Sequence, residues 1–358
     1  MPWDKRRTEN VLREIREALP GPLNLMEVCG THTMAIAKSG LKAMLPPGIR
    51  LLSGPGCPVC VTPPQVIDAV LELSLEKDVL LTSYGDMLRV PGSRAGDSLL
   101  RRKALGAQIE TVYSPVDAVE FALRHPEKQV VFLGVGFETT APGTAAAVLT
   151  AQEKGAKNFS VWSMLKCVEP ALRTLIQSEG FAVDGFLCPG HVASIIGARG
   201  FAFLPEEYGL PAVVAGFEPE DILLAVGRLV RQLAEHRPRL ENAYPRAVSE
   251  HGNRLAQQML ETCFERRFDL WRGLGGIGES GLQLKPALRD FDAELRFKVS
   301  YPETETKTPC RCGDVITGRC SPEDCPLFGK RCTPEDPVGP CMVSSEGACA
   351  AAWKYKGA

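Results

Sequence analysis

Residues 26–37 have the sequence MEVCGTHTMAIA, and residues 133–147 have the sequence LGVGFETTAPGTAAA. Each stretch consists of a short apolar run, a loop that contains glycine and threonine, and a segment rich in alanine with helical spacing. Strand, loop and helix in this order form the repeating unit of parallel α/β sheets. The two stretches therefore predict an α/β fold, and their likeness predicts two domains of similar design.

The same alternation extends along the chain from residue 23 to about residue 237. Segments between and after the apolar runs have the amphipathic spacing of helices, several with Pro or Ser near their start. This pattern predicts two parallel-sheet α/β domains at residues 22–127 and 128–238. Residues 1–21 and 239–358 are predicted to form a third domain, mostly helical and loop-rich, with a helix around 249–267. Strands are predicted at 23–28, 49–54, 78–83, 109–113, 129–137, 159–164, 183–190 and 211–217.

Composition excludes several classes of protein. The 358 residues carry a net charge of −2 with scattered basic residues, which argues against a nucleic-acid partner. There is no run of 18 apolar residues, so we expect no membrane span. The first ten residues lack the apolar stretch of a signal peptide. We therefore expect a cytoplasmic protein.

The cysteines point to metal or thiol chemistry, because structural disulfides are rare in the cytoplasm. Seven of the 13 cysteines fall between residues 310 and 349, in a segment with many turn residues and no clear periodicity. Such a segment needs a cross-link, of which a bound metal is the expected kind, in order to fold. The cysteine spacing does not form two zinc knuckles, so it favours an iron–sulfur cluster, with zinc as the alternative.

A second cysteine motif lies at residues 54–60, GPGCPVC. Cys57 and Cys60 stand between a predicted strand and a predicted helix, which is the placement of a redox dithiol. The helix dipole would lower the pKa of a thiol there. The alternative is a pair of buried cysteines that act as small apolar side chains.

Cys29 and His32 follow the first predicted strand, and Asp86 follows the third. Ligands bind at the carboxyl ends of strands in open α/β sheets, where these residues would converge with Cys57 and Cys60. Three thiols in one place could hold a soft metal ion or exchange disulfides. The alternative is that Cys29 is a buried cysteine and His32 a capping residue.

The remaining motifs give weaker support for a functional site. The stretch at 133–147 lacks the third glycine of a dinucleotide fingerprint, so we reject a nicotinamide site. Cys188 and His191 could form a nucleophilic pair, but packing at a strand end explains them as well. Cys167 and Cys263 lie on predicted helices and are expected in the core.

Taken together, the motifs resemble those of the HypD family of hydrogenase maturation factors. The resemblance implies two similar α/β domains and a third that carries a [4Fe-4S] cluster. It also implies a scaffold with redox chemistry that assembles the Fe(CN)2CO unit of [NiFe]-hydrogenase with the partners HypC and HypE. The matching stretches, in order, are CGTHT, GPGCPVC, SYGDMLRVPG, GFETTAPGTA, CPGHV and CTPEDPVGPCMVSSEGACAA.

The resemblance further implies roles for single residues. Cys29 would bind the iron together with the N-terminal cysteine of HypC, and Cys57 and Cys60 would form a redox dithiol near the iron and within electron-transfer reach of the cluster. Cys310 and Cys341 would be accessory thiols, and Cys320 is left without a role. The family's Cys-x12-Cys-x6-Cys-x16-Cys spacing selects as cluster ligands Cys312, Cys325, Cys332 and Cys349. The implied iron-handling or catalytic residues are Cys29, His32, Cys57, Cys60, Asp86, His191 and Glu346, with Cys29, Cys57 and Cys60 as iron ligands.

Two rival functions remain open from the sequence. One is a free-standing iron–sulfur thiol–disulfide reductase, and the other is an adaptor whose cluster is purely structural. The sequence does not decide whether the protein is an enzyme. It also leaves open the source of carbon monoxide, the order of ligand addition, the target hydrogenase and the oligomeric state.

Overall fold

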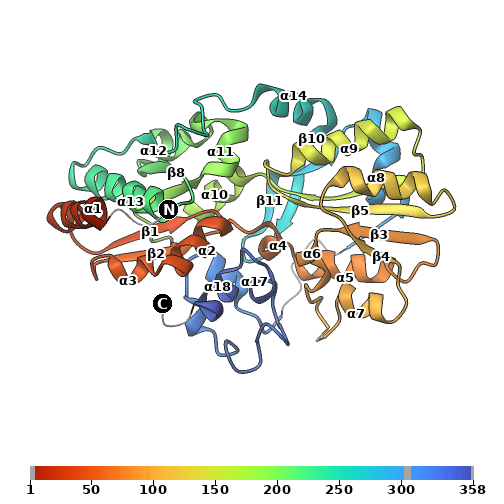
Figure 1. Ribbon diagram of the computed structural model, residues 1–358, viewed down its shortest axis with the longest axis horizontal. Coiled ribbons are helices and arrows are strands. Elements are labelled where there is room, and N and C mark those ends of the chain that lie inside the picture. Colours follow the sequence, from red (N-terminus) through yellow and green to blue (C-terminus); the bar gives the residue numbers. More distant parts are fainter. Residues whose placement is uncertain (1–4, 95, 302–307, 356–358) are drawn as a thin grey trace.

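Two parallel sheets form the framework of the protein, which the computed structural model describes for residues 5–94, 96–301 and 308–355 (Figure 1). Sheet A has the strand order β2-β1-β7-β8-β9, and sheet B has the order β4-β3-β5-β6. The predicted fold with parallel-sheet α/β units is confirmed, and all eight predicted strands are present. The strands of the two sheets are β1 Leu23–Glu27, β2 Ile49–Ser53, β3 Val79–Ser83, β4 Ile109–Thr111, β5 Gln129–Gly136, β6 Phe159–Leu165, β7 Gly185–Pro189, β8 Ala212–Ala215 and β9 Leu240–Asn242.

Helices connect the strands, because each parallel strand pair needs a crossover. None of the helices within the described ranges combines the length and apolar character that crossing a bilayer requires. The helices before β9 are α1 Lys5–Ala18, α2 Gly30–Ser39, α3 Leu41–Met44, α4 Pro58–Val61, α5 Pro64–Leu73, α6 Gly85–Leu88, α7 Leu99–Ala104, α8 Pro115–Arg124, α9 Ala141–Lys154, α10 Val168–Ile176, α11 Gly190–Ile196, η1 Ala198–Phe201, α12 Phe203–Tyr208 and α13 Pro219–Ala234. Those after it are α14 Arg254–Cys263, η2 Pro286–Phe291, α15 Ala293–Arg296, α16 Cys312–Ile316, η3 Pro322–Asp324, α17 Pro340–Val343 and α18 Ala348–Lys354.

The strand order corrects the predicted domain boundary at residues 127 and 128. The chain forms β1 and β2 in sheet A, crosses through α4 and α5 to build all of sheet B, and returns through α10 to complete sheet A. Strands from both predicted domains therefore share each sheet. The sequence could not reveal this, because a strand–helix–strand pattern is the same whether the second strand joins its own sheet or a neighbouring one.

The predicted third domain also needs correction. Helix α1 packs against α13 at the outer face of sheet A, so the described part of residues 1–21 belongs to that unit. The helix predicted around 249–267 ends at Cys263, and the residues after α14 form an antiparallel hairpin, β10 Phe264–Trp271 and β11 Gly275–Leu284. The hairpin lies beside β6, to which it is joined by the bridge between Lys166 and Gly281. Residues 1–4, 302–307 and 356–358 of that prediction lie outside the described residues.

Three hydrophobic clusters hold these units together. The outer face of sheet A packs with α1 and α13, and the outer face of sheet B packs with α8, α9 and α14. The third cluster joins both sheets to the cysteine-rich segment, and includes Met26 of β1, Val131 of β5 and Met342 of α17. The C-terminal helices α17 and α18 thus lie against the junction of the two sheets (Figure 1).

Candidate functional site

The strand order of sheet A reverses between β1 and β7, which makes the crevice outside their carboxyl ends the expected ligand position. Cys29 follows β1 and His191 follows β7, so two of the predicted site residues flank this crevice. Asp86 follows β3, beside the corresponding reversal between β3 and β5 in sheet B. The placement of these residues at strand ends is as the sequence predicted.

Cys29 is the N-cap residue of α2. Two glycines next to its loop are packed so closely that neither position has room for a side chain. A Cβ atom on Gly56 would lie 2.2 Å from the Cys29 backbone nitrogen, and one on Gly30 would lie 2.3 Å from Glu346 Cβ. Burial, and then the charge of Glu346, raise the pKa of the Cys29 thiol to about 12, against hydrogen bonds from the backbone of His32 and Thr31. A thiolate at this position therefore needs a nearby cation in place of its proton.

Glu27 supports this loop and was not singled out from the sequence. Its Oε2 accepts a hydrogen bond from the Cys29 backbone N–H at 3.0 Å, and its Oε1 accepts one from Thr33 Oγ1 at 2.5 Å. Burial raises the pKa of Glu27 to about 8, while these hydrogen bonds act in the opposite direction. The signal was available, since Glu27 is the one charged residue in the apolar run LNLMEV.

His32 is fully buried, and its imidazole is directed to the end of β8. Its Nε2 lies 2.9 Å from the Gly216 carbonyl oxygen, which can only accept, so Nε2 carries the proton. Burial lowers the pKa of His32 to about 4, which keeps the ring neutral. The ring centroids of His32 and His191 lie 4.9 Å and 3.9 Å from that of Phe217. His32 therefore contacts Cys29 through its backbone N–H. Its ring packs against Phe217, as the ring of His191 also does.

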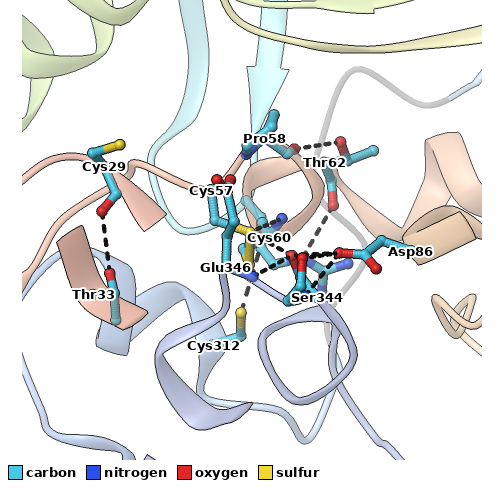
Figure 2. The surroundings of a disulfide bond; sticks show 12 residues. Cys29, Thr33, Cys57, Pro58, Cys60, Thr62, Asp86, Cys312, Ser344 and Glu346 are labelled. Carbon is cyan, nitrogen blue, oxygen red and sulfur yellow. Dashed lines mark hydrogen bonds between the residues drawn. A yellow bond between two sulfur atoms is a disulfide. The ribbon is translucent and has the colours of Figure 1, made fainter. Parts of the chain in front are cut away.

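Cys57 and Cys60 form a disulfide across α4 (Figure 2). Cys57 caps this helix, since its Sγ accepts a hydrogen bond from the Cys60 backbone N–H at 3.1 Å. It also lies 3.4 Å from Ser344 Oγ, a residue that the sequence did not single out. The two cysteines are only 4% and 0% exposed, so their sulfur atoms are enclosed by the protein.

The loop 344–346 connects the ends of both sheets. Asp86 Oδ2 accepts hydrogen bonds from Ser345 N at 2.7 Å and Ser345 Oγ at 2.8 Å, while Glu346 Oε1 accepts one from Thr31 Oγ1 at 2.9 Å. Burial raises the pKa of Glu346. Figure 2 shows Cys29 and Asp86 on opposite sides of the disulfide, with Ser344 and Glu346 beside it. The structure thus brings five predicted residues together: Cys29, Cys57, Cys60, Asp86 and Glu346.

The cysteine-rich segment encloses a cavity beneath α4. Six cysteines line it, whereas Cys320 lines a different pocket along β2. The Cys312 thiol donates to the Cys60 carbonyl oxygen at 4.0 Å, and hydrogen bonds with Cys310 and Cys341 lower the pKa of Cys312. The cysteines lining the cavity are Cys310, Cys312, Cys325, Cys332, Cys341 and Cys349, which include all four predicted cluster ligands.

The donor set of this cavity fits an iron–sulfur cluster. Thiolates are the ligands of such clusters, and apart from Arg311 the other lining side chains, such as Val315, Leu327 and Phe328, are apolar. Among the described residues, no three His, Cys, Asp or Glu side chains are grouped to hold a single metal ion. A cubane cluster distributes four thiolates over four irons, so its ligands stand farther apart than those of one ion.

Nearly the whole chain is similar to known proteins. Residues 6–356 match the family model HypD, described as "Hydrogenase formation hypA family". The chain is 47% identical over 342 residues to the hydrogenase maturation factor HypD of Rhodobacter capsulatus, covering 94% of this chain and 90% of that protein. It is 44% identical over 336 residues to the factor of the same name from Escherichia coli, with the same coverage. A third relative is the hydrogenase expression/formation protein HupD of Azotobacter chroococcum, 45% identical over 337 residues, covering 92% of this chain and 89% of that protein.

Proposed function

Because the chain belongs to the HypD family of hydrogenase maturation factors, we propose that it holds the iron of the Fe(CN)2CO unit of [NiFe]-hydrogenase during assembly. In this proposal a HypC-type chaperone supplies a second thiolate, and a HypE-type protein supplies the cyanide. The assembly works in the cytoplasm, where protein disulfides are transient and tied to redox function. The observation that supports this best is the convergence of Cys29, the Cys57–Cys60 pair and the cysteine-lined cavity at one junction.

Cys29 is the proposed anchor of the iron cargo. Cys29 is 7% exposed at the switch point of sheet A, and burial and the charge of Glu346 disfavour a free thiolate. An incoming iron cation replaces the proton and removes this penalty, because it supplies the missing positive charge. Glu27 holds the Cys29 backbone N–H, so the sulfur position is fixed before iron arrives.

The test is the infrared spectrum of the anaerobically co-purified complex with HypC. Cys29→Ala should remove the cyanide and carbon monoxide bands. The matched control is Cys263→Ala, which deletes another buried thiol, in α14 at the outer face of sheet B. Bands of normal intensity in Cys29→Ala would contradict the role of Cys29 as an iron ligand.

A [4Fe-4S] cluster is the proposed resident cofactor, held by Cys312, Cys325, Cys332 and Cys349. When bound, it supplies one-electron redox chemistry. Cys325→Ser should lower both iron and acid-labile sulfide in the purified protein, whereas Cys320→Ser, outside the cavity, should not. One zinc per chain with no sulfide would contradict the cluster and favour the zinc alternative.

Cys57 and Cys60 are the proposed redox dithiol next to the iron site. The rival function, a reductase for soluble disulfides, requires a substrate to reach the sulfur atoms of residues that are only 4% and 0% exposed. This burial favours an internal role in assembly. Under mild oxidation, mass spectrometry should find a Cys57–Cys60 disulfide, and Cys57→Ser should stop maturation. Steady turnover of a disulfide substrate without HypC would favour the reductase.

A further inference from the structure

Sheet B has its own cavity at a carboxyl end, separate from the thiol site. It has a volume of about 390 Å³, opens to the surface and lies where β5 and β6 end, lined in part by α14 and the β10–β11 hairpin. This volume falls within the range of about 300–1,000 Å³ that is typical of small-molecule sites. None of the residues assigned above to iron, cluster or dithiol chemistry lines it.

Glu138, on the loop after β5, lies in the wall of this cavity. It is 6% exposed, and its Oε1 accepts a hydrogen bond from the Val168 backbone N–H at 2.9 Å. Its Oε2 is buried without a hydrogen-bond partner among the described residues. A buried carboxylate oxygen that lacks a donor is destabilising, so such an atom calls for an explanation. A ligand with a positively charged donor would satisfy it.

Most of the charged side chains that line the cavity are acidic, as Glu138 is. Four glutamates line it, and Arg266 is the one basic residue among its lining side chains. Arg266 is directed toward Glu169, with Nη2 3.9 Å from Oε2, so its charge is already matched. The remaining acidic side chains are Glu138, Glu261 and Glu265. Apolar walls contributed by Leu260, Phe264 and Leu282 would accommodate a short hydrocarbon chain.

We propose that this cavity is a second ligand site, which binds a small organic cation through a salt bridge between its primary ammonium group and the carboxylate of Glu138. The short hydrocarbon part of the ligand packs against Leu260 and Leu282. Burial raises the pKa of Glu138 to about 7, while the charge of Arg266 lowers it. A bound ammonium group lowers it further. The proposal does not depend on the iron chemistry, because it rests on different residues.

The test is isothermal titration calorimetry on the full-length protein with n-butylammonium chloride, and with butan-1-ol as the neutral analogue. We expect saturable binding of butylammonium and none of butan-1-ol. Glu138→Gln retains an acceptor for Val168 N–H and removes the charge, so it should weaken butylammonium binding by at least about tenfold. Glu179→Gln, the same change on an exposed glutamate outside the cavity, should leave the affinity unchanged.

A second variant keeps the test valid if Glu138→Gln does not fold. Leu260 is a half-buried residue of α14, and Leu260→Trp should fill the cavity and abolish binding while leaving the carboxylate in place. Near-ultraviolet circular dichroism checks the fold of each variant. The proposal is overturned if butylammonium does not bind, if butan-1-ol binds equally well, or if folded Leu260→Trp binds as tightly as the unaltered protein.

Discussion

The carboxyl ends of sheets A and B start from the same strand–loop–helix unit, yet they are completed by different parts of the chain. At sheet A, the loop after β1 is crossed by residues 344–346 and lies beside the disulfide. At sheet B, the loop after β5 faces α14 and the β10–β11 hairpin. Each loop contains or adjoins a buried glutamate. Both carboxylate oxygens of Glu27 accept hydrogen bonds, whereas Glu138 has one oxygen without a partner among the described residues.

This difference shows what the repeated unit provides and what it does not. The unit places a loop and a helix N-terminus at the strand end, which is a general position for ligands. The chemistry comes from segments that are distant in sequence. Sheet A receives thiols and acceptors from the C-terminal segment, and sheet B receives acidic and apolar side chains from α14 and the hairpin.

The largest expected effect concerns the attachment of the hairpin to sheet B. Lys166 Nζ lies 2.7 Å from Asp269 Oδ2, and the two side chains are 2% and 7% exposed. Lys166→Met leaves Asp269 buried without its partner, which should lower the free energy of unfolding by about 3–5 kcal/mol. Urea denaturation measures this. The double variant Lys166→Met with Asp269→Leu should recover most of the loss, and an equal loss in both variants would contradict the pairing.

A smaller effect should distinguish the loops of the two sheets. Gly56→Ala places a methyl group 2.2 Å from the Cys29 backbone nitrogen, and should lower the free energy of unfolding by about 2–3 kcal/mol. Gly143→Ala in α9 is the matched control, since its nearest neighbour would be 3.7 Å away. That variant should be neutral, or more stable by about 0.5–1 kcal/mol because glycine disfavours helix. Equal destabilisation by the two changes would show that the loop around Gly56 is packed no more closely than the helix around Gly143.

The carboxylate of Glu138 should make stability depend on pH. Its pKa is about 7 in the folded protein, chiefly because of burial, against 4.5 as the ordinary value. Between these two values the folded state keeps a proton that the unfolded state has lost, so stability falls as pH rises through this window and levels off above it. The slope approaches about 1.4 kcal/mol per pH unit, which gives roughly 3 kcal/mol over the whole window.

Glu138→Gln removes this titration. Urea unfolding across the window should give a flatter pH profile for the variant than for the unaltered protein. Parallel profiles would show that Glu138 is already ionised in the folded state at low pH.

The smallest effect concerns the loop that completes sheet A. Asp86→Ala removes the acceptor of two hydrogen bonds from Ser345, and should destabilise that loop by about 1–2 kcal/mol. Amide hydrogen exchange at residues 344–347 should become faster. Asp117→Ala is the control, because Asp117 caps α8 through Ser114 N and Tyr113 N and does not contact this loop. Faster exchange at 344–347 in both variants would indicate a general loss of stability.

Much of the fold could be predicted because its signals are local. Eight strands were marked by apolar runs such as QVVFLGVGF, and Cys29 and Asp86 were placed at strand ends by the residues around them. The hairpin was missed because FERR continues the polar pattern of α14, and glycines in 275–281 hid the second strand. The periodicity of a segment indicates its secondary structure only where one face is clearly apolar.

The sequence by itself determined the parallel α/β units, the positions of the thiols at strand ends and the cysteine-rich segment that closes the chain. These depend on residue type and on spacing over a few positions. Only the tertiary structure decided that β1 pairs with β7, that Cys310 and Cys341 share the cavity of the predicted cluster ligands, and that His32 bonds to Gly216. It also decided that both carboxylate oxygens of Glu27 accept hydrogen bonds, whereas one oxygen of Glu138 has no partner within the part of the chain that the structure describes. The pairing of β1 with β7 and the bond of His32 to Gly216 join segments more than one hundred residues apart, which meet only when the whole core has packed.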